Sequence, residues 1–148
     1  PLLRDRLHAP ITIIGSEPPH WLKELSDPKI LVTGYVRDLA AYLNRCRLTI
    51  APLRYGAGVK GKVLESMSYG VPVVATSIAA EGIPAQDGCA LLIADDPLRF
   101  ADAVMELYMN QTLWNELSIN GLVLIENYFS ASVARAALVR LFQELVHH

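Results

Sequence analysis

The sequence has little cysteine and no long apolar run. Its two cysteines, Cys46 and Cys89, are far apart, and neither has a second Cys or His at the spacing of zinc ligands. We therefore expect two buried free thiols and no metal site. No segment reaches the roughly 18 uninterrupted apolar residues of a membrane-spanning helix, and the N-terminus lacks the pattern of a signal peptide. These absences favour a cytoplasmic protein.

An excess of positive charge is also lacking. Thirteen Lys and Arg stand against 15 Asp and Glu, for a net charge of -2, and the basic residues are scattered. Phosphate-backbone binding needs a clustered basic surface, so nucleic-acid binding is excluded as the expected function. His147 and His148 end the chain and are typical of the remainder of a purification tag.

The composition instead indicates one compact domain. Hydrophobic residues make up 52% of the chain and charged residues 19%. A chain of this length buries about 68 to 70% of the surface that its unfolded form exposes. One domain over residues 1–148 with a sizeable core is therefore expected.

Short β-branched runs alternate with helical patterns along most of the chain. The runs are ITIIGS (11–16), ILVTGY (30–35), LTIAPL (48–53), PVVATS (72–77) and ALLIA (90–94). They lack polar alternation, which is typical of strands covered on both faces. From Asp96 onward three helical segments follow, with breaks near Asn110 and Tyr128. The pattern predicts an α/β fold: a doubly wound parallel sheet, helices on both of its faces, and extra C-terminal helices.

The loop RYGAGVK (54–60) is the strongest candidate for a site. Ligands of open α/β sheets bind beyond the carboxyl ends of the strands, and this loop follows the third predicted strand. Gly56 and Gly58 permit a positive φ or close approach to a ligand, and unpaired N–H groups of a helix start attract anions. Lys60 lies in the first turn, so we expect its side chain to extend across the carboxyl edge of the sheet.

The helix that follows has one apolar face and one polar face. Counted from Val59 at about 100° per residue, the residues expected to face the sheet are Val59, Val63, Leu64 and Met67. Lys62 and Glu65 fall together on the far side, where they are either ligand-binding residues or a surface ion pair of about 0.2 to 0.5 kcal/mol. The loop is neither a Walker motif nor a G-x-G-x-x-G dinucleotide motif.

The run GAGVKGKVLESMSYGVPVVATSIAAEGI, followed by DGCALLIADDPLRFADAV, resembles a known family. It is similar to the C-terminal, nucleotide-sugar-binding half of family-four retaining glycosyltransferases, which have the two-domain GT-B fold. The likeness extends from Ile11 to Leu145, because ILVTGYVRDLAAYL and NYFSASVARAALVRLFQEL also match family segments. The resemblance implies a nucleotide-diphosphate sugar as the substrate, with no metal and no other cofactor.

The resemblance also implies roles for single residues. Glu65 matches the second glutamate of the family's Glu-x7-Glu motif, whose carboxylate accepts hydrogen bonds from the donor ribose. The other donor-binding residues that it implies are Gly58, Val59, Lys60 and Lys62 at the diphosphate, and Tyr35 and Val36 at the base. The first glutamate of the motif is replaced by Ala57. The segment 78–82 resembles the family's loop near the sugar.

Two parts of the family pattern are missing from the sequence. The family's donor domain opens with a strand and an Arg/Lys pair that also binds the diphosphate, and Pro1 matches a point after them. The N-terminal acceptor domain, which should carry the catalytic residues, is missing too. The resemblance thus implies an N-terminally truncated donor domain, with an acceptor that is a polysaccharide or lipid-linked. It implies membrane association only through the acceptor or the missing domain.

Two other classes of function stay open at this point. One is a nucleotide-sugar epimerase or phosphorylase with the same fold. The other is a non-catalytic, receiver-like module, for which the first strand end offers only Glu17 where an acidic cluster is needed.

Several further residues have structural interpretations. Asp95 and Asp96 are expected to begin a helix rather than to bind a metal. Asp87 and Gly88 are expected in a turn. The two tryptophans, Trp21 and Trp114, are expected to pack in the core, and Glu81 could face either solvent or the cleft.

Overall fold

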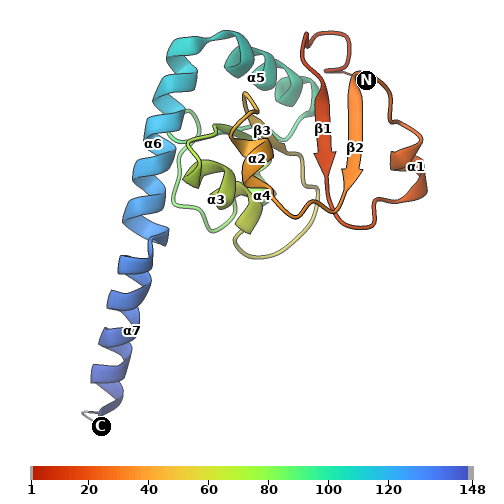
Figure 1. The fold of residues 1–148 in the computed structure, drawn as a ribbon. Coiled ribbons are helices and arrows are strands. Elements are labelled where there is room, and N and C mark those ends of the chain that lie inside the picture. Colours follow the sequence, from red (N-terminus) through yellow and green to blue (C-terminus); the bar gives the residue numbers. More distant parts are fainter. Residues whose placement is uncertain (1, 147–148) are drawn as a thin grey trace.

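The computed structural model describes residues 2–146, and it confirms the predicted alternation of strands and helices (Figure 1). The tag interpretation of His147 and His148 concerns residues outside this range. The strands are β1 (Ile11–Ile14), β2 (Ile30–Gly34), β3 (Thr49–Ala51), β4 (Val73–Ala75) and β5 (Leu92–Ile93). The short helices are α1 (His20–Lys23), α2 (Ala40–Leu43), α3 (Gly61–Ser68) and α4 (Ser77–Ala80). The C-terminal helices are α5 (Pro97–Met109), α6 (Gln111–Phe129) and α7 (Ala131–Val146).

All strand pairs within the described residues are parallel, but they form two sheets rather than one. β1 pairs with β2, and β3, β4 and β5 pair in that order. In Figure 1, β1 stands between β2 and the three-stranded sheet. Within residues 2–146, each sheet has two edges that no strand covers: those of β1 and β2 in one sheet, and those of β3 and β5 in the other.

Residues 43–129, here called the packed half, enclose the core. All three residues of β4 are buried, and their side chains alternate between the two faces of the sheet. Val73 and Ala75 pack with α3, α4 and the second half of α6. Val74 packs with α5 and the first half of α6. Helices thus cover both faces of the sheet at β4, as the sequence predicted.

Residues 2–42, here called the open half, have no fully buried residue. In β2, Leu31 is 49% exposed, and its neighbours are only half-buried. The expectation that every strand is covered on both faces is therefore wrong for β1 and β2, and also for β3, whose Ile50 is 37% exposed. Burial needs a second layer, and the short α1 is too small to supply one.

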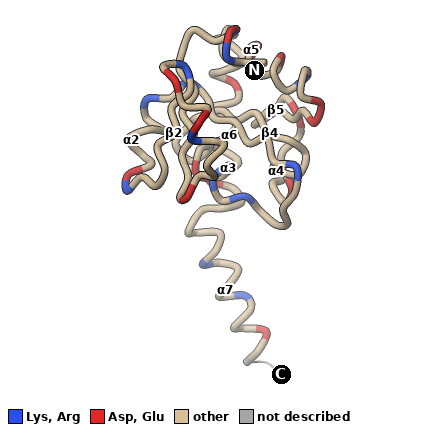
Figure 2. Tube along the Cα trace, turned by 90° about the vertical axis from the view of Figure 1, so that its right-hand side faces the viewer, with Lys and Arg blue, Asp and Glu red and all other residues tan. Residues whose placement is uncertain are grey.

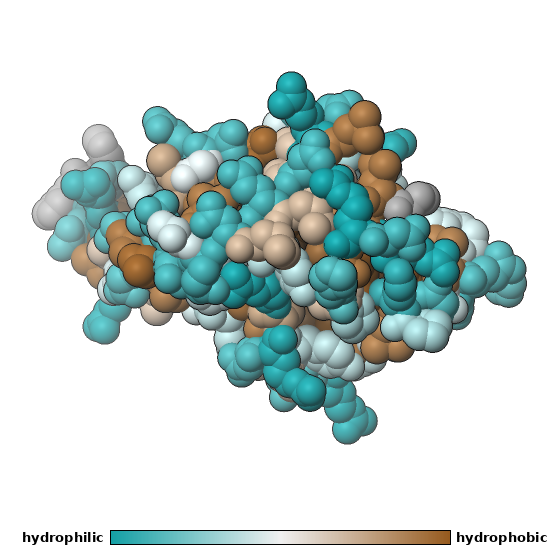
Figure 3. Space-filling model, turned by 90° about the horizontal axis from the view of Figure 1, so that it is seen from above, coloured by the Kyte–Doolittle hydropathy of each residue, from teal (hydrophilic) through white to brown (hydrophobic). Residues whose placement is uncertain are grey.

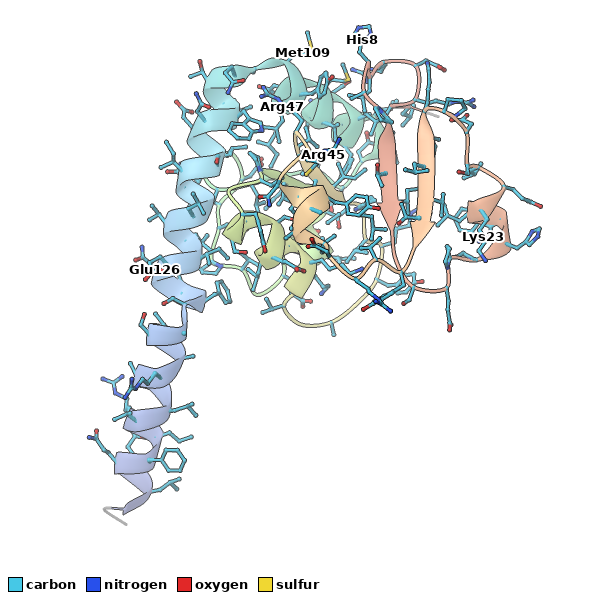
Figure 4. The ribbon with its side chains drawn as sticks, in the orientation of Figure 1. His8, Lys23, Arg45, Arg47, Met109 and Glu126 are labelled. Carbon is cyan, nitrogen blue, oxygen red and sulfur yellow. The ribbon has the colours of Figure 1, made fainter. Side chains whose placement is uncertain are left out.

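Helix α7 continues beyond α6 and projects away from the body of the molecule (Figure 1). The break between the two helices is at Ser130, whose backbone is extended with ψ 158°. Residues 131–145 are all exposed, and Figure 4 shows their side chains around a helix without neighbours. Leu138, Leu141, Phe142 and Leu145 share one face, which is thus an uncovered apolar stripe.

The cysteine and tryptophan predictions have mixed outcomes. Cys89 is exposed, so its predicted burial is wrong; Cys46 is half-buried, and burial raises the pKa of its thiol. Trp114 packs against the core, and its indole N–H donates to the Arg47 carbonyl at 2.5 Å. Trp21 is 63% exposed on α1, so the prediction that it packs in the core is wrong.

Charged and apolar side chains are mixed on the surface. In Figure 2, basic and acidic residues are interspersed along the trace. The face seen from above in Figure 3 is largely hydrophilic, with scattered hydrophobic residues. Arg45 and Arg47 precede β3, so they lie at the amino end of that strand, opposite the candidate loop (Figure 4).

Candidate functional site

The loop between β3 and α3 has the backbone that the sequence predicted. Gly56 has φ 136° and Gly58 has φ 72°, both in the region that favours glycine. Lys60 caps α3 with an extended backbone, φ -89° and ψ 100°, so the helix begins at Gly61 rather than at Val59. Val59 therefore does not face the sheet, contrary to expectation, and it is 46% exposed.

The start of α3 presents a row of unpaired N–H groups. In the described part of the chain, no acceptor pairs with the backbone N–H groups of residues 58–62. The first paired donor is Val63, which bonds to the Lys60 carbonyl at 2.9 Å. Unpaired donors at a helix N-terminus carry partial positive charge and bind anions, so this row can hold a phosphate.

The Lys60 side chain folds back over this row. Its Nζ donates to the Gly58 carbonyl and lies 3.6 Å from Oε2 of Glu81. The side chain is 14% exposed, whereas that of Glu81 is 56% exposed. Glu81, which the sequence left between solvent and cleft, is therefore at the edge of the candidate site.

Close backbone packing holds the loop after α4 against the loop before α3. Gly82 has φ 75°, and a Cβ placed on it would lie 2.7 Å from Cγ2 of Val59. Only glycine permits this approach, so the positions of Val59 and Glu81 are linked. Figure 1 shows α3 and α4 together at the same end of the molecule.

Hydrogen bonds join the carboxyl ends of the three strands. The Thr76 hydroxyl donates to the Leu53 carbonyl at 2.7 Å and accepts from Ala79 N–H at 3.2 Å. Asp95 accepts from the backbone N–H and the hydroxyl of Ser77, at 2.8 and 2.9 Å. The edge that carries the candidate loop is thus fixed by Thr76 and Asp95. The sequence analysis did not single out Thr76, although a threonine that ends a strand before a helix is a common N-cap.

The α3 residues are arranged as the helical wheel predicted. Val63 and Met67 are buried against the sheet, while Lys62 and Glu65 are exposed on the opposite side. Lys62 and Glu65 form no ion pair among the described residues. The surface ion-pair interpretation of these two residues thus has no support, and both remain available to a ligand.

Tyr35 and Val36 lie in the loop after β2, a strand of the other sheet. They follow Gly34, which ends β2 with φ 75°. Tyr35 is 72% exposed and Val36 is half-buried. No hydrogen bond within residues 2–146 joins these two residues to the loop before α3; they share with it the position after the carboxyl end of a parallel strand.

The predicted helix start and turn are confirmed. Asp96 caps α5, and its carboxylate accepts from the N–H groups of Leu98 and Arg99, both at 3.0 Å. Gly88 has φ 77° in the turn after Asp87. In the described chain, no three His, Cys, Asp or Glu side chains are grouped so that they could hold a metal ion.

A separate cavity of about 360 Å³ lies between residues 84–90 and the second half of α6. Its lining contains no charged side chain and no residue of the loop before α3. It therefore offers no counter-charge to a diphosphate, and it is not part of the candidate site.

The chain is similar to known glycosyltransferases in sequence and in structure. The family described as "Glycosyl transferases group 1" matches residues 1–110. An uncharacterized 44.6 kDa protein in the cps region of Klebsiella pneumoniae is 38% identical over 95 residues, which are 64% of this chain and 24% of that protein.

Solved structures share the fold. HepE (Alr3699) from Anabaena in complex with UDP superposes with a TM-score of 0.83 at 14% identity, covering 97% of this chain and 44% of HepE. HepE has also been solved in complex with UDP-glucose. The C-terminal domain of the group 1 glycosyl transferase LpcC from Francisella tularensis gives a TM-score of 0.63 at 18% identity, covering 71% of this chain and 56% of that one. This chain spans about half of each of these proteins.

Proposed function

Because the chain belongs to the group 1 glycosyl transferases, we propose that it is the donor-binding domain of an enzyme that transfers a sugar from a nucleotide-diphosphate sugar to an acceptor. The observation that carries the proposal is the row of unpaired N–H groups at residues 58–62 beside Lys60. This row is at the carboxyl end of the sheet, where ligands of open α/β sheets bind. Supporting it, the HepE structures hold UDP or UDP-glucose on the same fold.

In this proposal each part of the nucleotide sugar binds to a chemically matching group of the protein. The diphosphate accepts from the N–H groups of Gly58 and Val59, and from Lys60 and Lys62. Charge-assisted hydrogen bonds of this kind contribute about 1.5 to 3 kcal/mol each. Glu65 accepts from the ribose hydroxyls, and backbone groups of Tyr35 and Val36 contact the base. Cations and helix N–H groups at a departing diphosphate stabilise the charge that develops during transfer. The proposal needs neither a metal ion nor another cofactor.

The uncovered edges of β1 and β3 support the proposal that further chain precedes Pro1. Doubly wound dinucleotide-binding sheets commonly have the strand order 3-2-1-4-5-6. If β1 to β5 are strands two to six, the observed pairs β2-β1 and β3-β4-β5 are what remains without strand one. A strand from upstream would join the two sheets. It would also bring the Arg/Lys pair that the family resemblance implies.

The acceptor side of the reaction is proposed from the relatives. We assign it to a second, N-terminal domain, since this chain spans 24% of its Klebsiella relative. The relative's place in a "cps region" agrees with a polysaccharide or lipid-linked acceptor. Retention of the anomeric configuration is proposed from the family resemblance alone.

Donor transfer is proposed to take place in the cytoplasm. One helical stretch among the described residues, Gln111–Leu145, is long and apolar enough to cross a membrane, with mean hydropathy 1.3. The α6 part packs on the core through Leu117 and Leu124, and α7 has 16 residues where about 20 are needed. We therefore assign the α6 part of this stretch to the core, and any membrane association to the acceptor or to the second domain.

A thermal-shift panel tests donor binding. The chain is heated with UDP, GDP, ADP and their nucleotide sugars, and with adenosine as a control that lacks the diphosphate. One nucleotide series should raise the Tm, because a ligand at a hundred times its Kd stabilises the folded state by about 2.7 kcal/mol. A panel in which no diphosphate shifts the Tm more than adenosine does would contradict the proposal.

A transfer assay tests whether sugar transfer needs the proposed N-terminal domain as well as this chain. The chain by itself should transfer no radiolabelled sugar, whereas a longer protein that restores the upstream part should do so. Positioning of two reactants contributes about 7 to 11 kcal/mol to barrier lowering, and one side of a cleft cannot supply it. Equal turnover by the two proteins would contradict the two-domain mechanism.

A further inference from the structure

Glu81 is a carboxylate held at a fixed place beside the row of N–H groups. It follows α4 directly, and the α4 residues Ala79 and Ala80 are buried. The Thr76 hydroxyl caps this helix, and Gly82 contacts Val59 on the other side of Glu81. The backbone of Glu81 is therefore fixed relative to the loop before α3, and only its side chain is free to move.

The Glu81 side chain lies close to Lys60, the residue proposed to bind the diphosphate. Its Oε2 lies 3.6 Å from Lys60 Nζ, yet more than half of the side chain is exposed. A group bound at the N–H groups of residues 58–62 would therefore meet this carboxylate together with Lys60. A carboxylate is an unusual neighbour for a diphosphate, because two like charges repel each other.

The repulsion differs between the donor and the product. In a nucleotide sugar, the distal phosphate is esterified to the sugar and has one negative charge. In the released nucleoside diphosphate this phosphate is terminal, and since its second pKa is about 6, it gains most of a second charge at pH 7.5. The attached sugar also offers hydroxyl donors to a carboxylate, which a free diphosphate does not. A carboxylate at this place therefore favours the donor over the product.

We propose that Glu81 is a specificity residue that makes the site prefer the nucleotide sugar to the nucleoside diphosphate, and so promotes product release. This inference rests on the proposed function. In the structure, Glu81 is the counter-ion of Lys60. With donor bound, its carboxylate accepts from the sugar hydroxyls.

The test is calorimetry at pH 7.5 with UDP and UDP-glucose, or with the GDP or ADP pair if the thermal-shift panel selects it. It compares the parent chain with E81Q, which keeps the shape and removes the charge. E81Q should bind the nucleoside diphosphate more tightly and the nucleotide sugar more weakly. The ratio of the two Kd values should thus change by about tenfold.

Two control variants isolate the effect. E65Q alters a residue proposed to bind ribose, which donor and product share, so it should change both Kd values and leave their ratio as in the parent. E106Q removes an exposed charge from α5 and should change neither Kd value. All variants should keep the parent Tm.

A ratio in E81Q within about twofold of the parent's, with both ligands still bound, would overturn the role of Glu81 and leave the proposed function intact. If the parent chain bound neither member of any pair, the proposed function would fail, and this inference with it.

Discussion

β4 in the packed half and the two strands of the open half have similar compositions and very different burial. β4 in the packed half is completely buried, with α3 on one face and α5 on the other. β1 and β2 in the open half have the same β-branched composition, but none of their residues is fully buried. The comparison shows that an apolar strand is fully buried only where the chain supplies helices on both of its faces and a strand on both of its edges.

The largest expected effect is a core substitution in the packed half. Leu107 is fully buried on α5 between Val74 and Leu117, so L107A should lower the free energy of unfolding by about 2 to 5 kcal/mol. The same truncation at the exposed Leu31 of β2 should cost less than about 1 kcal/mol. Urea denaturation measures both. Equal losses would show that the open half is as well packed as the core.

A smaller effect is expected where the two site loops touch. G82A places a methyl group 2.7 Å from Val59 Cγ2 at φ 75°, and should cost about 1 to 3 kcal/mol. Gly88 is a matched control, since it has φ 77° and no atom within 4 Å of an added Cβ. G88A should therefore cost only the backbone strain. If the two variants lost the same stability, the contact between the loops would be unimportant.

Loss of a helix N-cap should cost more stability in the packed half than in the open half. D96A removes the carboxylate that accepts two N–H groups at the start of the 13-residue α5, and should cost about 0.5 to 2 kcal/mol. Asp38 accepts one N–H, from Ala41, at the start of the four-residue α2. D38A should cost less, because α2 contributes only Leu43 to the core. Thermal unfolding of both variants checks this order.

The smallest effect is expected in the acid stability of the open half. The N–H groups of Lys29 and Ile30 and the nearby Arg4 hold the pKa of Asp27 below its ordinary value of 3.8. A lowered pKa stabilises the fold above the unfolded pKa, and this contribution is lost as the pH falls through the folded pKa. The open half should therefore loosen at acid pH, below about 3.8.

The two tryptophans can report on the halves separately. Trp21 is in the open half and Trp114 in the packed half. In the W114F protein, an acid titration of Trp21 fluorescence should show the loosening, and adding D27N should remove its dependence on Asp27. If the Trp21 fluorescence of the W114F protein titrated identically with and without D27N, Asp27 would not stabilise the open half.

Much of the fold could be predicted from local patterns. The five strands and the three C-terminal helices lie where the β-branched runs and helical spacings placed them, and Asp96 and Gly88 have their predicted roles. The start of α3 was misplaced by two residues, because the left-handed Gly58 and the extended Lys60 delay the helix.

Burial and long-range contacts could not be predicted from local patterns. Trp21 and Cys89 have apolar neighbours in sequence, but whether those neighbours are covered depends on segments that pack from elsewhere. The contact between Lys60 and Glu81 joins residues 21 positions apart, and it arises only because β4 and α4 return the chain to the same sheet edge. The separation of β1 from β3 likewise depends on strand order.

The central claim is that residues 58–62 and Lys60 bind the donor diphosphate, and calorimetry with the nucleoside diphosphate selected by the thermal-shift panel tests it most directly. The account predicts that K60A weakens binding by about tenfold or more, K62A by a smaller factor, and the K29A control not at all. Lys60 is expected to dominate because it folds over the unpaired N–H groups, while Lys62 is exposed on the far side of α3. Equal affinity of K60A and the parent for the diphosphate would contradict the claim.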